Sequence, residues 1–302
     1  MLESPTVEST GGYRLVKLAN GAHSVHSLAH HETFHPVIGP VAEAEALYVR
    51  QLRLIERLQC HTGEFVLWDV GLGAAANALT ALRAARDIPC SIHILSFDHT
   101  LEPLAFALQH REALGYLAGY EPHVERLLHE QHCIFQDGAL TVKWDMHLAD
   151  FPTLLAQPAA RELDQPHAVM FDAFSPAKNP AMWTQPLFAN LFQLLSPDRP
   201  CSLPTYSRST MLRVTLLLAG FFVGVGHATG EKEETTIAAN TPDLIAEPLD
   251  RRWLERARRS SSAEPMWEPV YRQAPLSPAT LERLLNHPQM VEAAQANKRP
   301  AG

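Results

Sequence analysis

An acid that directly follows an apolar strand is the residue of this sequence best placed to do chemistry. The run from His167 to Phe171 is made mostly of residues that favour β-strands, and it leads into Asp172 and a loop stiffened by Pro176 and Pro180. In open α/β sheets, ligands bind in the crevice beyond the carboxyl ends of the strands, so the pattern places Asp172 in such a crevice. The structural alternative is that Asp172 caps a turn and the prolines only stiffen a loop.

A turn of small residues nearer the N-terminus is the second candidate for chemistry. The apolar run over 64–70 predicts a buried strand containing Asp69, and Gly71, Gly73 and Asn77 follow it and open a helix that reaches about residue 85. Glycine lets a turn approach a ligand with no Cβ in the way, and the next helix presents backbone N–H groups that lack helical partners. The pattern indicates a cofactor site without choosing the cofactor.

Residues beyond the turn distinguish two cofactors. A nicotinamide cofactor would use a third glycine, where this sequence has Ala75 or Ala76. S-adenosylmethionine (SAM) has no phosphate and tolerates that variation better. Asp98 lies where an acid can accept hydrogen bonds from both ribose hydroxyls, and Asp150 could receive the adenine amino group, which favours SAM. The alternative role for each acid is a helix N-cap.

The elements that position these residues alternate along the chain. Repeated strand and helix units predict an α/β fold with a mostly parallel sheet and helices on both faces. Four of the strands end near Asp69, Asp98, Asp150 and Asp172. The predicted strands cover 64–70, 91–98, 139–150, 167–171 and 200–206, the predicted helices cover 76–85, 103–114, 187–195 and 210–219, and a hairpin joins 221–225 to 234–239.

The two ends of the chain differ from this middle part. Alternation after Gly12 and the Asn20-Gly21 dipeptide predict an N-terminal hairpin, and a helix is expected over 41–58 after Pro40. The chain after Asn240 is rich in arginine and proline. We therefore expect an N-terminal hairpin and helix extension over 1–50, a SAM-binding domain over 51–240 and an Arg-rich helical tail over 241–302, frayed after about residue 294.

Composition limits the partners. The 302 residues are 46% hydrophobic and carry a net charge of −8, which gives no overall attraction to a phosphate backbone. A nucleic-acid partner would need a local basic patch, for which 251–259 is a candidate together with Arg208, Arg213 and Lys232; a solvated helix face is the alternative, since Glu255 interrupts the run. No apolar run reaches the roughly 18 residues of a membrane span, and no secretory signal is apparent, so we expect a cytoplasmic location with no membrane partner.

Cysteines and histidines give no metal signature. Cys60, Cys90, Cys133 and Cys201 are widely spaced, which argues against a zinc knuckle and a disulfide framework and predicts reduced, buried thiols. Histidines crowd the N-terminal region at positions 23, 26, 30, 31 and 35, but their spacing fits no compact ligand pattern. We expect no metal.

Several segments resemble the MnmC-type methyltransferases, which complete 5-methylaminomethyl-2-thiouridine at the wobble position of tRNA. The residues from Asp172 to Trp183 resemble the hallmark motif of that family. The run from His31 to Glu43 resembles its N-terminal signature, Gly71 to Asn77 its SAM loop and Gly230 to Thr235 its C-terminal hairpin, so the similarity covers about residues 10–240. Ala75 departs from the family's usual glycine. The chain resembles the form that lacks the large FAD-dependent oxidase domain of some relatives.

The resemblance implies a class I, Rossmann-like SAM-dependent methyltransferase that acts on the aminomethyl group at position 5 of wobble uridine. Its substrate would be a tRNA whose aminomethyl group is made by upstream modification enzymes. Asp172 would be catalytic, because it could orient the amine and take its proton. The implied cofactor-binding residues are Glu43, Asp69, Gly71, Gly73, Asn77, Asp98, Asp150 and Asp172, and the implied substrate-binding residues are Phe174, Pro176, Lys178, Trp183, Arg208 and Lys232.

Two other functions remain open at this stage. A small-amine methyltransferase or an aminopropyltransferase-like enzyme could share the fold, and the acidic net charge would suit it. A non-catalytic RNA-binding relative is the other alternative, suggested by Ala75. Turnover of small amines without tRNA would favour the first, and failure to bind SAM would favour the second.

Overall fold

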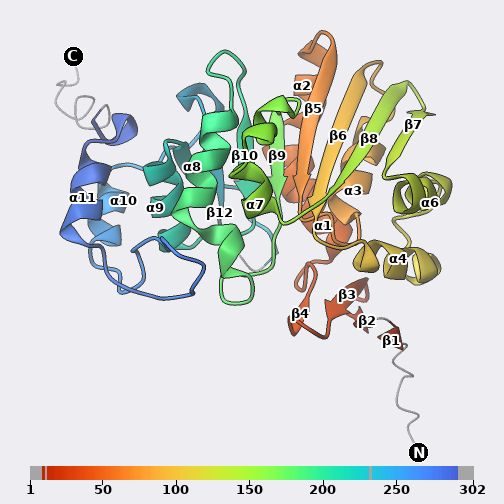
Figure 1. Cartoon of the computed structure of the whole chain (residues 1–302), viewed down its shortest axis with the longest axis horizontal. Helices are drawn as coiled ribbons and strands as arrows, with labels where there is room; N and C mark the ends of the chain where they lie inside the picture. Colours follow the sequence, from red (N-terminus) through yellow and green to blue (C-terminus); the bar gives the residue numbers. More distant parts are fainter. Residues whose placement is uncertain (1–8, 11, 231–232, 292–302) are drawn as a thin grey trace, which may run out of the picture. The chain divides into compact units, whose positions relative to one another are not determined.

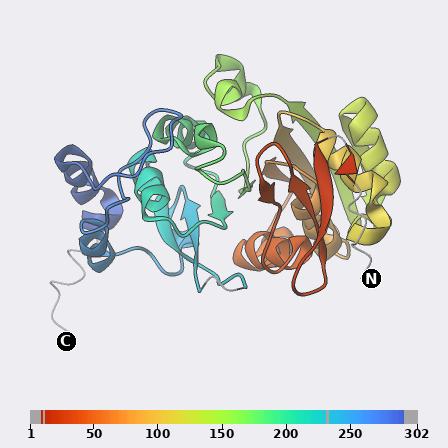
Figure 2. The same ribbon diagram turned by 90° about the horizontal axis from the view of Figure 1, so that it is seen from below.

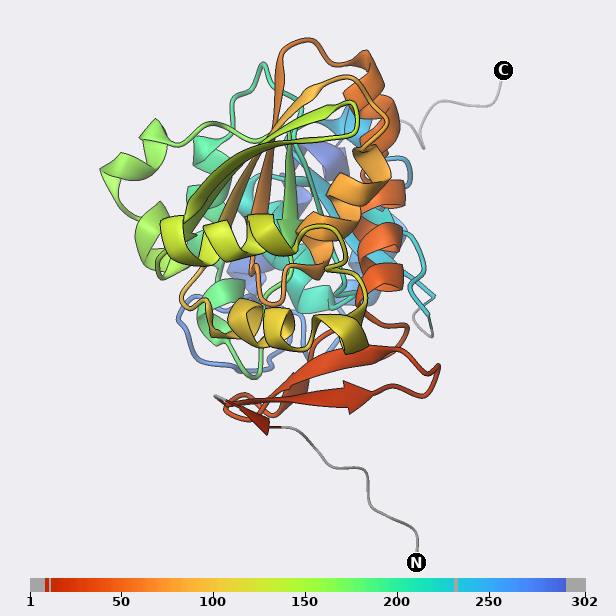
Figure 3. The ribbon, with the colours of Figure 1, turned by 90° about the vertical axis from the view of Figure 1, so that its right-hand side faces the viewer.

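A computed structural model describes residues 9, 10, 12–230 and 233–291, and Lys232 and the predicted frayed end after residue 294 lie outside them. The chain divides into two compact units, which the three ribbon views colour by sequence (Figures 1–3). This division differs from the three successive parts expected from the sequence, because two internal segments, 170–174 and 228–233, belong to the first unit. The first unit comprises Met1–Asp150, Met170–Phe174 and Ala228–Glu233, and the second comprises Phe151–Val169, Ser175–His227 and Glu234–Gly302.

The sheet of the first unit confirms the predicted parallel strands. β5 (Glu64–Val70) pairs in parallel with β6 (Ser91–Asp98), which pairs in parallel with β8 (Leu140–Leu148). The end of β9 (Ala168–Phe171) adjoins β5, so that the backbone N–H of Asp172 donates to the carbonyl oxygen of Val70 at 3.0 Å. The carboxyl ends of β5, β6 and β9 therefore come together.

One edge of this sheet was not predicted. β7 (His132–Asp137) pairs with β8 in the antiparallel sense, and Gly138 makes the turn between them at φ +61°. Helix α6 (Glu121–Glu130) precedes β7 and was also missed. The other helices of this part of the chain are α3 (Ala76–Ala85), α4 (Glu102–Gln109) and α5 (Arg111–Leu114), so the single helix expected over 103–114 is broken.

The N-terminal hairpin is confirmed as part of a small antiparallel sheet. β2 (Tyr13–Lys17) pairs with β3 (His23–Ser27), and the short strands β1 (Ser9–Thr10) and β4 (Glu32–Thr33) flank them (Figure 3). The turn uses the predicted Asn20-Gly21 dipeptide: the Asn20 side chain accepts from the N–H of Ala22 at 3.1 Å, and Gly21 has φ +87°. This sheet carries the histidine-rich segment.

The helix expected over 41–58 is interrupted. It begins at Pro40, one residue before the predicted start, but α1 (Pro40–Ala44) passes into a π-helical segment η1 (Glu45–Gln51), and α2 (Leu54–Cys60) starts only after Arg53. Arg53 has a left-handed backbone with φ +50°, which a continuous right-handed helix cannot contain. Apolar residues on both sides of the break, such as Leu47 and Leu54, are buried, so tertiary packing overrides the regular pattern.

The second unit holds the other strands. β10 (Ser202–Thr205) is parallel to β9 at Ala168 and antiparallel to β12 (Thr235–Ala239), which pairs with β11 (Phe222–Gly226), as the predicted hairpin required. The helix after each strand is also found, with α8 (Gln185–Leu194) following β9 and α9 (Thr210–Ala219) following β10. The short helices are α7 (Phe151–Leu155), η2 (Pro158–Glu162), η3 (Pro180–Trp183) and η4 (Pro242–Leu244).

The described part of the C-terminal tail is an integral part of the second unit. It contains α10 (Arg251–Ala257) and α11 (Pro278–Leu285), and α11 contacts α9 (Figure 2). The side chain of Gln289 accepts from the N–H of Val223 at 2.8 Å and donates to the carbonyl oxygens of Val223 and Leu249 at 2.8 and 2.7 Å. These bonds fix the tail to strand β11, so it belongs to the unit and is not an independent appendage.

The sequence also predicted the state of the cysteines and the absence of a membrane span. All four cysteines are free; Cys133 and Cys201 are buried as expected, whereas Cys60 at the end of α2 is exposed, so that part of the expectation was wrong. Among the described residues, no helix is both long and apolar enough to cross a membrane.

Candidate active site

The glycine turn after β5 brings the backbone close to Asp172. Gly71 has φ +87°, and a Cβ placed on it would lie 2.6 Å from the carbonyl oxygen of Asp172. Gly73, at φ +51°, donates its N–H to Oδ2 of Asp98 at 2.9 Å. The sequence prediction that this turn, Asp98 and Asp172 come together is therefore matched by the geometry, and glycine at position 71 is required for the approach.

The carboxylate of Asp172 is held by groups from two other elements. Its Oδ2 accepts a hydrogen bond from Nδ2 of Asn77, in the first turn of α3, at 2.7 Å. The Nε2 atom of His35 lies 3.5 Å from the same oxygen. Asn77 was predicted from the sequence as part of this site, whereas His35 was quoted only as part of a motif.

A further acid lies on the other side of His35. The Nδ1 atom of His35 is 3.5 Å from Oε1 of Glu43, which belongs to α1, and the side chains of His35, Glu43 and Asp172 are only 8%, 6% and 14% exposed. Their ligand atoms are near enough to one another to hold a metal ion. The two ring nitrogens face different carboxylates, so the three side chains could also form a chain of ion pairs without a metal. The expectation of no metal stays a prediction.

Aromatic side chains cover the glycine turn and Phe174. The ring of His30 stacks on Phe174 with 4.0 Å between centroids and 15° between planes, and Phe34 meets Phe174 edge-on at 5.4 Å. A Cβ on Gly73 would lie 3.1 Å from the Phe34 ring. Sequence reasoning proposed Phe174 for the site but missed His30 and Phe34, because contacts between the N-terminal sheet and the strand ends leave no periodic signal.

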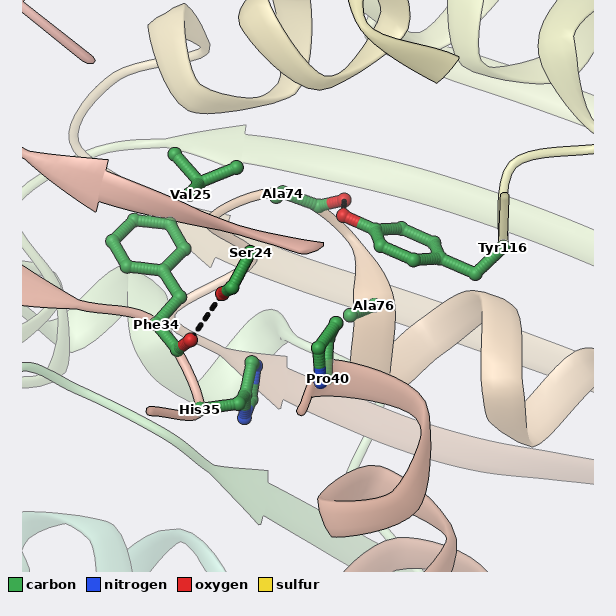
Figure 4. Close-up of a pocket in the computed structure, with 8 residues that line it drawn as sticks. All are labelled: Ser24, Val25, Phe34, His35, Pro40, Ala74, Ala76 and Tyr116. Atoms are coloured by element: carbon green, nitrogen blue, oxygen red, sulfur yellow. Dashed lines mark hydrogen bonds between the residues drawn. The ribbon is translucent and has the colours of Figure 1, made fainter. Parts of the chain in front are cut away.

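A small pocket adjoins the turn (Figure 4). The hydroxyl of Tyr116 closes one side by donating to the carbonyl oxygen of Ala74 at 3.0 Å, and the Ser24 hydroxyl bonds to the carbonyl oxygen of Phe34 on the other. Tyr116 therefore fixes the backbone of the turn at Ala74, whereas the Ser24 bond fixes the segment at Phe34. The lining residues are Ser24, Val25, Phe34, His35, Pro40, Ala74, Ala76 and Tyr116.

The residues of the turn fit a polar cofactor. Oδ1 of Asp69 and Oδ1 of Asn77 are buried acceptors with no hydrogen-bond partner among the described residues. Buried polar groups in native proteins are normally paired, so such atoms indicate a site for a ligand or ordered water. Asp98, at the end of β6, accepts N–H groups from Gly73 and His99, as an acid at the edge of a cofactor site would. Asp150 is exposed two residues beyond β8, and its predicted contact with adenine remains a prediction.

We expect Asp98→Ala to weaken SAM binding by about 1–3 kcal/mol, because the carboxylate both receives the ribose hydroxyls in our assignment and fixes the N–H of Gly73. Isothermal titration calorimetry with the full chain measures the change. Glu102→Ala, which removes an exposed acid at the start of the neighbouring helix α4, is the matched control. Equal affinities for the two variants would refute the assignment of Asp98.

Burial raises the pKa of Asp69 to about 7 from its ordinary value of 3.8. Its side chain is 1% exposed, and Oδ2 accepts from the Ser96 hydroxyl at 2.9 Å. Because the folded chain then binds this proton more tightly than the unfolded chain, the stabilisation is complete below about pH 4 and is lost as the pH rises through 7.

Asp69→Asn should therefore become progressively more stabilising, relative to the unsubstituted chain, between about pH 4 and 7, and the difference should level off above pH 7. An amide oxygen can still accept from Ser96, while the cost of burying a charge disappears. Thermal unfolding across this pH range measures the effect, with the exposed Asp87→Asn as control. A stability difference that does not change with pH would show that Asp69 titrates normally.

The remaining predicted substrate residues belong to the second unit. Lys178 and Arg208 are exposed and Pro176 is half-buried, so all three side chains can be reached by a substrate from solvent. Trp183 is fully buried and meets Tyr206 edge-on at 5.9 Å, which makes it a packing residue of this unit and argues against contact with a substrate. The predicted role of Lys232 falls outside the described residues.

The basic patch is partly as expected. Helix α10 and the two residues after it expose Arg251, Arg252, Arg256, Arg258 and Arg259. Arg213 does not join them, because it is 4% exposed, pairs with Glu234 at 3.1 Å and donates to the carbonyl oxygen of Thr235 at 2.8 Å. Its suggested place in the patch was wrong: a guanidinium on the inner face of α9 is held by the backbone of β12.

Comparison with known proteins agrees with a cofactor-binding role for this site. A family described as S-adenosyl-L-methionine-dependent methyltransferase matches residues 120–241. Two proteins named tRNA 5-methylaminomethyl-2-thiouridine biosynthesis bifunctional protein MnmC are also similar. The one from Ectopseudomonas mendocina is 32% identical over 235 residues, 73% of this chain and 34% of the relative, and the one from Aeromonas hydrophila is 30% identical over 211 residues, 64% and 30%.

The chain thus spans about a third of the length of these curated relatives. Among solved structures, MNMC2 from Aquifex aeolicus has a TM-score of 0.64 and 21% identity, with 95% of this chain and 86% of that chain covered. This similarity shows a shared fold. A mostly parallel sheet, a glycine turn with an acid after the next strand and the family match together define a SAM-dependent methyltransferase, whose cofactor is SAM. Within that class, the chain belongs to the MnmC-type methyltransferases.

Proposed function

We propose that this methyltransferase transfers a methyl group to the aminomethyl group at position 5 of wobble uridine in tRNA. The observation that carries the proposal is the carboxylate of Asp172, which lies against the glycine turn and is held there by Asn77. The similar MnmC proteins are named for the biosynthesis of 5-methylaminomethyl-2-thiouridine in tRNA, which supports this choice of substrate.

Methyl transfer to an amine requires the protein to remove a proton from the nitrogen and to orient that nitrogen toward the methyl group. An alkylamine has a pKa near 10 in water, so the substrate nitrogen must lose a proton before it can attack. When bound, SAM supplies an electrophilic methyl group on a sulfonium. Asp172 would accept a hydrogen bond from the amine, hold its nitrogen in line for attack and receive its proton, directly or through water. A carboxylate suits this task because it is a strong acceptor, and its negative charge stabilises the positive charge that develops on the nitrogen during methyl transfer.

Although the net charge is acidic, tRNA would be recognised by local groups of basic side chains. The exposed arginines of α10 and its C-terminal end, together with Arg208 and Lys178, offer local positive charge for phosphate contacts. Pro176 and Phe174 would wall the base. Upstream modification enzymes would have to supply the aminomethyl group, and we place the enzyme with its tRNA substrates in the cytoplasm.

The test is methyl transfer from labelled SAM to tRNA that carries unmethylated aminomethyluridine, followed by nucleoside analysis. Unmodified tRNA and free polyamines are the parallel substrates. Label in methylaminomethyluridine alone would support the proposal. Label in a polyamine would instead identify a small-amine enzyme, and absence of both label and SAM binding would identify a relative without catalytic activity.

A further inference from the structure

We propose that His35 is a positioning residue for Asp172, a role that rests on the proposed function of that carboxylate. His35 joins Asp172 to Glu43, so that Glu43, His35, Asp172 and Asn77 form one buried polar chain, the His35 chain. Its links are 3.5 Å from Glu43 to His35, 3.5 Å from His35 to Asp172 and 2.7 Å from Asn77 to Asp172.

The His35 chain holds the carboxylate of Asp172 from two directions. The Asn77 amide and the His35 ring both address Oδ2 of Asp172, one from α3 and the other from the segment before α1. Two contacts on one oxygen limit rotation about the bond between the Cβ and carboxyl carbons, and thereby set the plane in which Asp172 meets an amine. A carboxylate left to rotate would spend much of its time in orientations that do not hold the nitrogen in line.

Glu43 contacts the ring nitrogen of His35 that does not face Asp172. The ring presents one nitrogen to each carboxylate, and the low exposure of all three side chains strengthens the electrostatic interactions between them. Asp172 and Glu43 are the acids that these contacts place at the ring, and Asn77 is the neutral group beside them. Removal of Glu43 should therefore loosen His35 and, through it, Asp172.

The backbone of His35 provides an independent observation. Its φ of +48° lies in the left-handed region, which side-chain-bearing residues adopt at a cost. Such conformations persist where the surrounding structure requires them and cluster at functional sites. His31, at φ +53°, has the same kind of backbone but an exposed side chain, so the chain contains its own matched control.

The test compares His35→Gly with His31→Gly. Glycine adopts positive φ without strain, so each substitution removes a ring while the backbone is preserved. We expect His35→Gly to lower kcat by about 10- to 100-fold with SAM affinity unchanged, since misplacement of a reacting group by about 1 Å can cost that much. Added imidazole should restore much of the rate, and His31→Gly should retain the original kcat.

Glu43→Gln should lower kcat in the same direction by a smaller factor, and the double substitution with His35→Gly should cost less than the product of the two single effects. Equal kcat values for His35→Gly and His31→Gly would overturn the proposal. So would a loss of SAM affinity without a change in kcat, or activity that chelation abolishes and a divalent cation restores, because His35 would then be a cofactor or metal ligand.

A measurement without turnover separates this proposal from the proposed function. The ¹⁵N resonances of the His35 ring, assigned by comparison with His35→Gly, should change in both Glu43→Gln and Asp172→Asn. If the protein does not methylate tRNA but these resonances respond, the function is wrong and the positioning contact stands. If they respond to neither substitution, His35 does not join the two acids.

Discussion

Asp172→Asn will reduce methyl transfer by roughly 10²–10⁴-fold, the range that removal of a general acid or base commonly produces. The amide has nearly the same shape, and its oxygen can still accept from Nδ2 of Asn77, so the fold and the site remain in place. It cannot receive a proton from the amine, and it lacks the negative charge that attracts one. Single-turnover transfer from labelled SAM measures the loss.

Asp172→Ala should be at least as damaging, because it also leaves Asn77 without its partner. Asp243→Asn, a change of an exposed acid in the second unit, is the control for loss of charge alone. SAM affinity should be measured in parallel. If Asp172→Asn transfers methyl groups at the original rate, Asp172 has no part in the mechanism.

The second large effect is expected for Gly71→Ala. The added Cβ would lie 2.6 Å from the carbonyl oxygen of Asp172, on a backbone with φ +87°. The left-handed conformation costs about 1–2 kcal/mol for an L residue, and overpacking adds typically 1–3 kcal/mol, so the free energy of unfolding should fall by about 2–5 kcal/mol. The turn or Asp172 must move, so transfer should also be lost.

Gly119→Ala separates the two causes. Gly119 has φ +86°, but a Cβ there would meet no heavy atom within 4 Å. This variant should show only the conformational cost and should keep its activity. Denaturant unfolding and methyl transfer on both variants decide the matter, and equal losses would mean that the close approach at Gly71 contributes nothing.

Much of this fold could be predicted because it depends on local patterns. The buried run of β5, the turn at Gly71 and Gly73 and the acid after β9 are features of neighbouring residues, and parallel strands bring their carboxyl ends to one edge. The proximity of Asp172 to the glycine turn follows from that rule alone.

Other elements could not be predicted, for different physical reasons. β7 is an edge strand of mixed polarity, so it lacks a buried apolar run, although Asp137-Gly138 was a readable turn signal. The break at Arg53 has no sequence signal, because packing of residues on either side imposes it. Trp183 sits in a motif that resembles a substrate loop, but motif resemblance does not reveal whether a side chain points inward.

The residues of the active site also divide into those predicted from local patterns and those placed by long-range contacts. Asp98 and Asn77 follow from their places beside the glycine turn, whereas His35 reaches Asp172 across 137 positions of the chain, through a left-handed backbone. A histidine among several others in a polar segment gives no hint of such a contact. The N-terminal histidines therefore gained a partial explanation only from the structure.

Ala75, the departure from the family's usual glycine, takes the left-handed conformation at φ +60° just before α3. The side chain is fully buried, so the loop accepts the strain. For an alanine this conformation costs about 1–2 kcal/mol, which exceeds the gain of about 0.4–1 kcal/mol from its smaller loss of backbone entropy on folding. Packing around the buried methyl group must therefore hold the loop in a shape that the backbone of residue 75 would not adopt by itself.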